Sequence, residues 1–379
     1  MKLKIGYWML AAAALSLTAC VYDRDLPDAD PEPVVLRLRL SAQSVSMPAT
    51  RADGHATEEA LDAENYIAVD ADDYRILLFD GAGRFLQDVD AAQKWLVSDG
   101  TVAKDTYRLT LTGPVELAAE EVQVLVLTNW EGFSPAAQYP VLDGADELSR
   151  IYPDAADAAW QFTMPLAADG KSSWRPEIAA KRGVPMFGVS EIIPLSAARE
   201  PSATDVLDGQ TVDGKVLDLG EIRLLRAVSK IEVLESNAAD AAQLAGVSLS
   251  AYDTAGRFIP DVTANPDWGV EKTQVSVPSL PAGAHRSTAA LQFFQVPGTA
   301  VWRAYVPEMD LRTARPELTF TLSGGERKSI ALDNPAAPGT LVSLLRNHIY
   351  RYVVSISGGA IILDVVPYDE TVLDPVFGK

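Results

Sequence analysis

Phe79-Asp-Gly-Ala-Gly-Arg-Phe-Leu-Gln-Asp88 returns later in the chain as Tyr252-Asp-Thr-Ala-Gly-Arg-Phe-Ile-Pro-Asp261, and each copy follows a strand-like segment. A second pair, Leu109-Thr-Leu-Thr-Gly113 and Phe320-Thr-Leu-Ser-Gly324, occurs in the same order. Asp and Gly suit tight hairpin turns, so one short match alone has a simple chemical explanation. Two matches in the same order favour two related domains.

The apolar residues between these motifs recur mostly with a period of two, in short segments broken by Gly, Pro, Asn and Asp. This pattern is typical of β-strands. About 360 residues remain after the N-terminal signal described below, enough for two domains with cores of their own. We expect an all-β fold of two tandem β-sandwich domains, 52–205 and 221–379, joined by a polar linker at 206–220. Helix is expected to be minor, with short pieces near 57–65 and 90–97.

The N-terminus has the organisation of a lipoprotein signal peptide over residues 1–19. Residues 1–4 are basic, residues 5–17 are almost all apolar, and Leu17-Thr-Ala-Cys20 follows. An apolar run this short is typical of a signal peptide rather than a membrane span. Cys20 is the only cysteine of the chain, and its place in a bacterial lipobox predicts that it is lipidated and becomes the new N-terminus. Acyl chains would then tether a soluble domain to a membrane.

Residues 20–33 are acidic and rich in proline, which predicts an extended tether. Two interpretations of this tether remain open: a plain linker, or a surface-export signal like the acidic residues that follow the lipidated cysteine in lipoproteins of Bacteroidetes. The chain has a formal net charge of -20. Such a charge repels phosphate backbones, so nucleic acid is excluded as a partner.

The segment 34–51 combines a strand pattern with an exposed loop. Leu36, Leu38 and Leu40 alternate with polar residues, and the small, polar stretch that ends near Arg51-Ala52 is of the kind that proteases cut. Cleavage after Arg51 would detach the lipid, the tether and this first strand together. The groove left behind would accept another extended segment by strand addition.

The C-terminal segment offers a candidate for that strand. Ile361, Leu363 and Val365 alternate with Ile362, Asp364 and Val366 close to the end of the chain. An ordinary last strand of the second sandwich explains the same alternation, and the residues alone favour that simpler interpretation.

No catalytic motif is present, and we expect no enzymatic activity, no cofactor and no metal. The three histidines share no metal-ligand spacing or nucleophile motif. Among the tryptophans, Trp130 and Trp302 lie in or at the end of strands and are expected in the core. Trp160, Trp174 and Trp268 lie in loop-like surroundings, and they are the candidates for a ligand-binding platform.

Several motifs, taken in order, resemble the Bacteroidales type V pilus fimbrillins. They are Leu17-Thr-Ala-Cys20, Thr50-Arg-Ala52, Tyr74-Arg-Ile-Leu-Leu-Phe-Asp80, Leu225-Arg-Ala-Val-Ser-Lys-Ile-Glu232, Tyr305-Val-Pro-Glu308 and Arg346-Asn-His-Ile-Tyr-Arg-Tyr352. The resemblance implies two transthyretin-like sandwiches, export as a lipoprotein, cleavage by an arginine-specific protease and polymerisation by strand exchange. It places the lipid on Cys20, the scissile bond at Arg51-Ala52, the lost strand at 34–45 and the donor strand within 360–367.

The hypothesis that follows is a stalk or tip subunit of a cell-surface fimbria, made as an outer-membrane lipoprotein precursor. Its expected partners are other fimbrial subunits in a homo- or hetero-polymer, the maturation protease and, before cleavage, the outer membrane. The alternatives are a monomeric surface lipoprotein that binds glycans or proteins as an adhesin, and a pilus anchor subunit that keeps its lipid.

Overall fold

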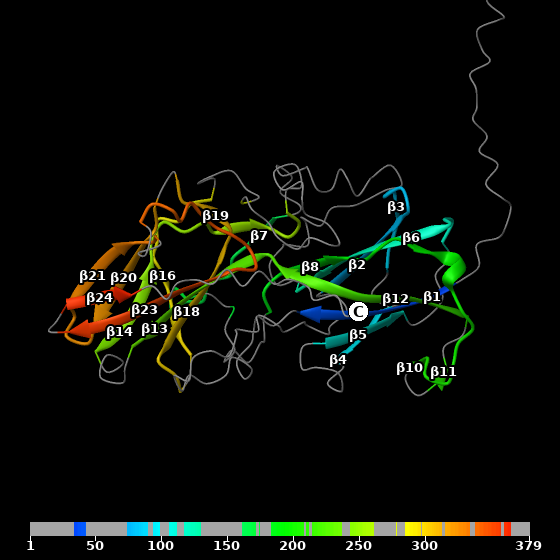
Figure 1. Ribbon diagram of the computed structural model, residues 1–379, viewed down its shortest axis with the longest axis horizontal. Helices are drawn as coiled ribbons and strands as arrows, with labels where there is room; N and C mark the ends of the chain where they lie inside the picture. Colours follow the sequence, from blue (N-terminus) through cyan, green and yellow to red (C-terminus); the bar gives the residue numbers. More distant parts are fainter. Residues whose placement is uncertain are drawn as a thin grey trace, which may run out of the picture. The chain divides into compact units, whose positions relative to one another are not determined.

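The computed structural model of the chain consists of β-strands and the loops between them (Figure 1). It describes residues 34–42, 74–89, 94–98, 106–111, 117–129, 161–171, 174, 183–207, 210–211, 214–236, 243–260, 278, 285–296, 298–312, 315–333, 338–357 and 360–364. Within these ranges the only helix is a single 3-10 turn at Leu195–Ala197. The prediction of an all-β chain is confirmed for this part of the molecule.

A nine-stranded sheet contains the N-terminal strands together with one strand from the middle of the chain. Its members are β1 (Val34–Ala42), β2 (Tyr74–Asp80), β3 (Phe85–Asp88), β4 (Lys94–Ser98), β5 (Thr106–Leu111), β6 (Glu121–Thr128), β8 (Met186–Val189), β9 (Ile193–Pro194) and β12 (Lys215–Arg226). The strand order is β3-β2-β6-β8-β12-β1-β5-β4, and β9 pairs with β6. β1 and β12 run parallel, whereas the other neighbours are antiparallel.

β2 and β6 form the most deeply buried part of this sheet. They pair antiparallel from Tyr74 opposite Thr128 to Asp80 opposite Val122. Successive residues of each strand are buried, so both faces of the pair are covered. Strands covered on both faces are expected to be almost continuously apolar, which accounts for the run Ile76-Leu77-Leu78-Phe79.

The second half of the chain forms two further sheets. Their strands are β13 (Val228–Glu235), β14 (Leu244–Leu249), β16 (Leu291–Gln292), β17 (Phe294–Gln295), β18 (Val301–Pro307), β20 (Glu317–Leu322), β21 (Arg327–Ala331), β23 (Ile349–Ser357) and β24 (Ala360–Asp364). One sheet has the order β17-β18-β13-β23-β24 and the other β16-β14-β20-β21. Residues of both sheets, Val233 and Leu318 among them, belong to one buried cluster.

Three short pairs complete the described strands. They are β10 (Val206–Leu207) with β11 (Gln210–Thr211), β7 (Gln161–Thr163) with β15 (Ala255–Arg257), and β19 (Met309–Asp310) with β22 (Ser343–Leu344). The β7–β15 pair joins a segment from each half of the chain.

The predicted linker and the predicted start of the second sandwich are both wrong in position. Residues 215–220 form the first half of β12, and residues 221–226 continue the same strand within the nine-stranded sheet. The reason is that the apolar residues within this mainly polar stretch pack into the fold, where Val216 and Leu217 are each 1% exposed. β13 follows after Ala227 alone, so no linker separates the two sets of sheets.

The helix predicted near 90–97 is also wrong where the structure describes it. Residues 94–98 form β4, which pairs antiparallel with β5. Pairing with a neighbouring strand outweighs the weak helical preference of so short a segment. The other predicted helical piece, 57–65, lies outside the described residues.

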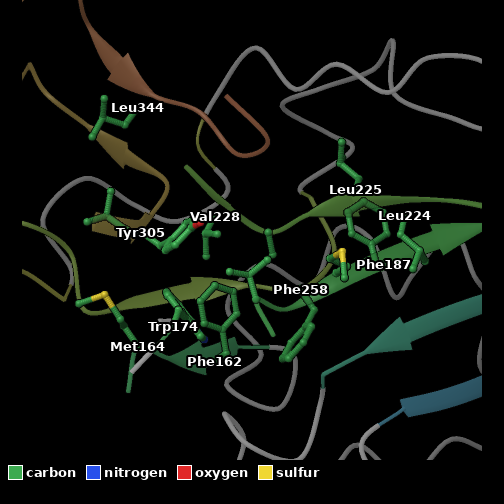
Figure 2. Close-up of a cluster of buried hydrophobic side chains, with 14 of the residues drawn as sticks. Phe162, Met164, Trp174, Phe187, Leu224, Leu225, Val228, Phe258, Tyr305 and Leu344 are labelled. Atoms are coloured by element: carbon green, nitrogen blue, oxygen red, sulfur yellow. The ribbon is translucent and has the colours of Figure 1, made fainter. Parts of the chain in front are cut away.

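One continuous core connects the two halves of the chain. Figure 2 shows Phe162 and Phe187, from the N-terminal half, in the same cluster as Phe258 and Leu344. By its contacts, Pro33–Lys379 forms a single compact unit.

Charged groups lie within this connecting core. The fully buried guanidinium of Arg346 donates to the backbone oxygen of Phe258 at 2.7 Å and pairs with Glu308 at 2.6 Å. It also lies over the ring of Phe187, 5.7 Å from its centroid. These contacts fix Arg346 where the two halves meet.

Candidate functional site

β1 has pairing partners on both of its edges. It runs parallel to β12, from Val34 opposite Lys215 to Ala42 opposite Leu224, and antiparallel to β5 over its residues 37–41. We call this position between β12 and β5 the β1 slot. Because both edges of β1 are occupied, its removal would leave backbone N–H and C=O groups of β12 and β5 without their partners.

The three leucines predicted for the lost strand all lie in the core. Leu36 and Leu40 are fully buried and Leu38 is 2% exposed, and all three belong to the main hydrophobic cluster. Full burial of one leucine side chain contributes about 1.5–3 kcal/mol. β1 is therefore held both by two backbone ladders and by a row of buried side chains.

β12 bulges opposite the middle of β1. Arg37 is paired with Asp218 and Arg39 with Glu221, so two residues of β12 stand opposite Leu38 alone. Gly220 lies in this bulge with φ of +72°, and its N–H donates to the Asp218 carboxylate at 2.9 Å. A left-handed φ favours glycine over residues with a side chain. The bulge keeps the leucines of β1 in register with the core.

A buried carboxylate connects β1 to the loop that precedes β10. Asp205 Oδ1 accepts from Arg37 Nη1 at 2.6 Å and from Arg199 Nη2 at 2.9 Å. Asp205 Oδ2 accepts from Arg199 Nη1 at 2.6 Å and from the backbone N–H and hydroxyl of Ser202, each at 2.7 Å. We call Arg37, Arg199, Ser202 and Asp205 the Asp205 cluster. Nothing in the sequence pattern indicated it.

The charge state of Asp205 follows from these contacts. The Arg199 guanidinium, followed by Ser202 and Arg37, holds the pKa of this carboxyl well below its usual range, although burial alone would raise it. The Asp205 side chain is only 1% exposed, compared with 22% for Arg37 and 44% for Arg199. Arg199 is tied to β12 by backbone hydrogen bonds in both directions with Val216. The cluster thus joins β1 to β12 through side chains as well as backbone.

The predicted donor segment lies at the margin of a sheet. β24 is the last strand in the order β17-β18-β13-β23-β24 and pairs antiparallel with β23. Lys328 Nζ, from β21, donates to the backbone oxygen of Ile361 at 2.5 Å. In the chain by itself, Ile361 and Leu363 therefore lie in an ordinary last strand, the simpler of the two interpretations drawn from the sequence. Val365 lies outside the described residues.

Trp174 does not form a ligand platform, and this prediction is wrong. Its side chain is fully buried and meets the ring of Phe162 edge to face, with centroids 6.1 Å apart (Figure 2). Trp302, expected in the core, is 8% exposed and confirmed there. The other predicted positions Trp130, Trp160, Trp268, Cys20, Arg51 and Ala52 lie outside the described residues.

A second charged cluster is buried in the five-stranded sheet. Glu232 on β13 pairs with Arg303 on β18 and with Arg351 on β23, each at 2.7 Å, and with Lys230 at 3.5 Å. Burial alone would raise the pKa of Glu232, but the three cations outweigh that effect and lower it. The carboxylate is thus shared among cations from three adjacent strands, an arrangement that serves to hold those strands together.

The described ranges contain neither a cluster of side chains that could hold a metal ion nor a helix that could cross a membrane. No group of three or more His, Cys, Asp or Glu side chains within them is arranged to hold a metal ion. They also contain no helix with the length and apolar character needed to cross a membrane.

No family model matches the sequence, and no curated protein matches it. Several solved structures have a similar fold. The tip fimbrial protein Mfa3 from Porphyromonas gingivalis, with a C-terminal truncation, is 15% identical, with 88% of this chain and 98% of that chain covered and a TM-score of 0.50. A protein from Bacteroides uniformis described as a candidate cell adhesion protein is 13% identical, with 88% and 95% covered and a TM-score of 0.43. The fimbrial anchor protein Mfa2 from Porphyromonas gingivalis is 11% identical, with 87% of this chain and 95% of that chain covered and a TM-score of 0.35.

The likeness to the Mfa3 tip protein extends over most of both chains. It confirms, at the level of the fold, the fimbrillin-like all-β architecture expected from the sequence.

Proposed function

We propose that this chain is a stalk or tip subunit of a cell-surface fimbria. It is exported as a lipoprotein through Cys20, matured by cleavage after Arg51 and polymerised by donor-strand exchange. Its partners are other fimbrial subunits, an arginine-specific protease and, until cleavage, the outer membrane. It performs no catalysis and takes no cofactor.

The observation that carries this proposal is the interior position of β1 directly upstream of Arg51. A strand at the edge of a sheet can be lost with little effect on its neighbours. β1 is paired on both edges and buries Leu36, Leu38 and Leu40. Its loss therefore leaves a deep vacancy rather than a shorter sheet.

Cleavage after Arg51 makes this vacancy accessible. Hydrolysis of the Arg51–Ala52 bond separates the segment that contains β1 from the rest of the chain. β1 is then held only by noncovalent contacts, and an incoming strand can replace it. The open edges of β12 and β5 offer backbone partners, and the three leucine positions offer apolar pockets, the two requirements of recognition by strand addition.

In this scheme the C-terminal segment 360–367 is the strand that this chain donates to a neighbouring subunit. Within the chain β24 is paired with β23 alone, so its release breaks one ladder rather than two. Support also comes from the fold shared with a protein described as a tip fimbrial subunit.

The test is cleavage-site substitution in the native bacterium. Arg51→Ala is expected to leave full-length lipoprotein on cells and to abolish its incorporation into fibres, measured by immunoblotting of sheared fimbriae. Arg327→Ala, at an exposed position of β21, is the matched control and should leave both unchanged. Fibres of normal abundance from Arg51→Ala would overturn the proposal.

Mass spectrometry of the native N-terminus separates the subunit from the anchor alternative. A mature chain that begins at Ala52 agrees with the proposal. A chain that begins at acylated Cys20 within purified fimbriae identifies an anchor that keeps its lipid, and it contradicts cleavage after Arg51.

A further inference from the structure

The β12 side of the β1 slot places two acidic residues opposite the two arginines of β1, whereas on the β5 side Arg39 stands opposite Arg108. In the β1–β12 ladder, Arg37 stands opposite Asp218 and Arg39 opposite Glu221. Arg37 also donates to Asp205 at 2.6 Å. Opposite charges on neighbouring strands are favourable, and like charges are unfavourable. The slot is thus fitted to a strand that is apolar toward the core and carries a basic residue at the Arg37 position, where both Asp218 and Asp205 lie.

Loss of β1 changes the surroundings of Asp205 most. Its side chain is 1% exposed in the intact chain and has Arg37 and Arg199 as its two guanidinium partners. When Arg37 leaves, the carboxylate keeps Arg199 and Ser202, but the side that faces the slot no longer has a cation. A strand that fills the slot buries this side of the Asp205 carboxylate again, whether or not the strand carries a positive charge to pair with the carboxylate.

The chain's own C-terminal segment does not supply that charge. Successive side chains of a strand point to opposite faces. If Ile361, Leu363 and Val365 take the three leucine positions, then only Ile362, Asp364 and Val366 remain for the face of Asp205. This holds whichever way the strand runs, because reversing a strand does not change the alternation. The opposite assignment is worse, since it turns Asp364 toward the apolar core.

A different register of the C-terminal segment in the slot does not supply a positive charge either. Residues 352–378 contain no lysine or arginine, and they include four acidic residues: Asp364, Asp369, Glu370 and Asp374. Every register of this segment therefore puts an uncharged or negative side chain where β1 has Arg37.

We propose that the β1 slot selects a donor strand with an arginine or lysine at the Arg37 position, and that this donor comes from a different subunit rather than from a second copy of this chain. This inference rests on the proposed strand exchange. It adds Asp205 as the residue that sets donor specificity, with Asp218 and Glu221 in support.

Strand peptides test this specificity without altering the fold of the protein. The full chain is cleaved after Arg51 with an arginine-specific protease, and the protease is then inhibited. Four peptides compete for the slot, and native mass spectrometry measures which ones displace Val34–Ala42. The peptides are an isotope-labelled Val34–Ala42 itself, its Arg37→Lys and Arg37→Gln variants, and residues 360–367 of this chain.

The expected order follows from charge. The natural and Arg37→Lys peptides should occupy the slot within a few-fold of each other. The Arg37→Gln peptide should bind about ten- to a hundredfold more weakly, the range for loss of a hydrogen bond between charged groups. Residues 360–367 should bind no better than the Arg37→Gln peptide. In Asp205→Asn protein, the preference for the natural peptide over its Arg37→Gln variant should largely disappear.

The outcomes separate this inference from the function on which it rests. If peptides enter the slot without regard to charge, or if residues 360–367 compete as well as Val34–Ala42, donor selection by Asp205 is wrong while strand exchange stands. If no peptide enters the slot after cleavage, both are wrong. Should Asp205→Asn fail to fold, the comparison of peptides on the unaltered protein still decides the question.

Discussion

β1 and β24 are the first and the last strands described, and they hold different positions in their sheets. Both alternate aliphatic residues along a short segment, yet β1 lies inside a sheet with a partner on each edge and β24 has one strand partner. Alternation determines which face of a strand is buried. It does not determine how many strands pair with it. The difference teaches that the strand proposed to leave is integral to its sheet, whereas the strand proposed to move is bound at one edge only.

The largest effect is expected from a charge at the centre of β1. Leu38→Asp places a carboxylate in the core and should lower the free energy of unfolding by more than about 4 kcal/mol, enough to prevent folding in many domains. Urea denaturation measures the change in the free energy of unfolding. If the variant does not fold, it should accumulate in inclusion bodies on expression. A loss below about 0.5 kcal/mol, the level of a surface substitution, would mean that β1 is not integral to the sheet.

Truncation of one aliphatic residue in each strand compares their packing directly. Leu36→Ala should cost about 3–4 kcal/mol and Ile361→Ala about 2 kcal/mol, because the cavity term is larger where the surroundings cannot collapse. Leu36 is fully buried in an interior strand, whereas Ile361 is 5% exposed in a marginal one. Chemical denaturation of both variants measures the difference. Equal losses of stability in the two variants would contradict the conclusion that β1 is packed more tightly than β24.

The Asp205 cluster should give β1 a stability that depends on pH. The pKa of Asp205 is lowered in the folded chain. Its contribution is therefore complete above the pKa of an unfolded aspartate, about 3.9, and is lost as pH falls below it. Asp205→Asn should destabilise the chain at pH 7, and the difference from the wild type should shrink below about pH 4. A difference that stays constant from neutral to acid pH contradicts this assignment.

Asp310→Asn provides the control for that measurement. The pKa of Asp310 is also lowered, chiefly by its hydrogen bonds from Arg312, but the Arg312 side chain is 67% exposed. Exposed pairs contribute little and are screened by salt. About 0.5 M NaCl should therefore reduce the effect of Asp310→Asn more than that of Asp205→Asn.

The smallest effect is expected at β24. Lys328→Met removes the hydrogen bond to the Ile361 carbonyl and should cost about 0.5–1.5 kcal/mol. Hydrogen exchange should quicken in β24 and stay unchanged in β1, since only the former loses a contact. Faster exchange in both strands would indicate that they are coupled, and it would weaken the contrast between them.

The repeat on which the two-domain prediction rests shows how local sequence and fold diverge. In the first copy Asp80 to Gly83 form a tight turn between β2 and β3, with Gly83 at φ of +79° and the Asp80 carboxylate bonded to the N–H groups of Ala82 and Arg84. A Cβ at Gly81 would clash with the side chain of Glu121. Glycine avoids that clash without a shift of its neighbour.

The second copy cannot repeat this arrangement. Thr254 occupies the place of Gly81, Asp253 pairs with Arg286 at 3.1 Å, and the next residues form β15 opposite β7. Gly256, at the place of Gly83, has no positive φ; a Cβ there would meet the Phe162 ring at 2.5 Å. The same short sequence thus forms a tight turn in one copy and a strand packed against the Phe162 ring in the other. The difference arises from residues that are distant in the sequence and pack against each copy.

The candidate site likewise has features that the local sequence predicts and features that depend on residues distant in the chain. The period of two correctly predicted the buried leucines of β1, because burial of one face is a local property. The Arg37–Asp205 contact and the parallel pairing with β12 join residues far apart in the chain, and no short window contains them. The prediction for Trp174 is wrong for the same reason, since the Phe162 ring that packs against it comes from another segment.

The parallel pairing of β1 with β12 also bears on the order of events during synthesis. Val34–Ala42 leaves the ribosome long before Lys215–Leu224, its partner strand, and pairings between such distant segments slow folding because a long loop must close first. The nine-stranded sheet therefore cannot be completed until β12 has emerged. A chain that begins at Ala52 lacks β1, so its sheet cannot be completed and it should refold less completely than the full chain in a dilution experiment. Under the proposed maturation, β1 would then be a folding template that is lost on cleavage.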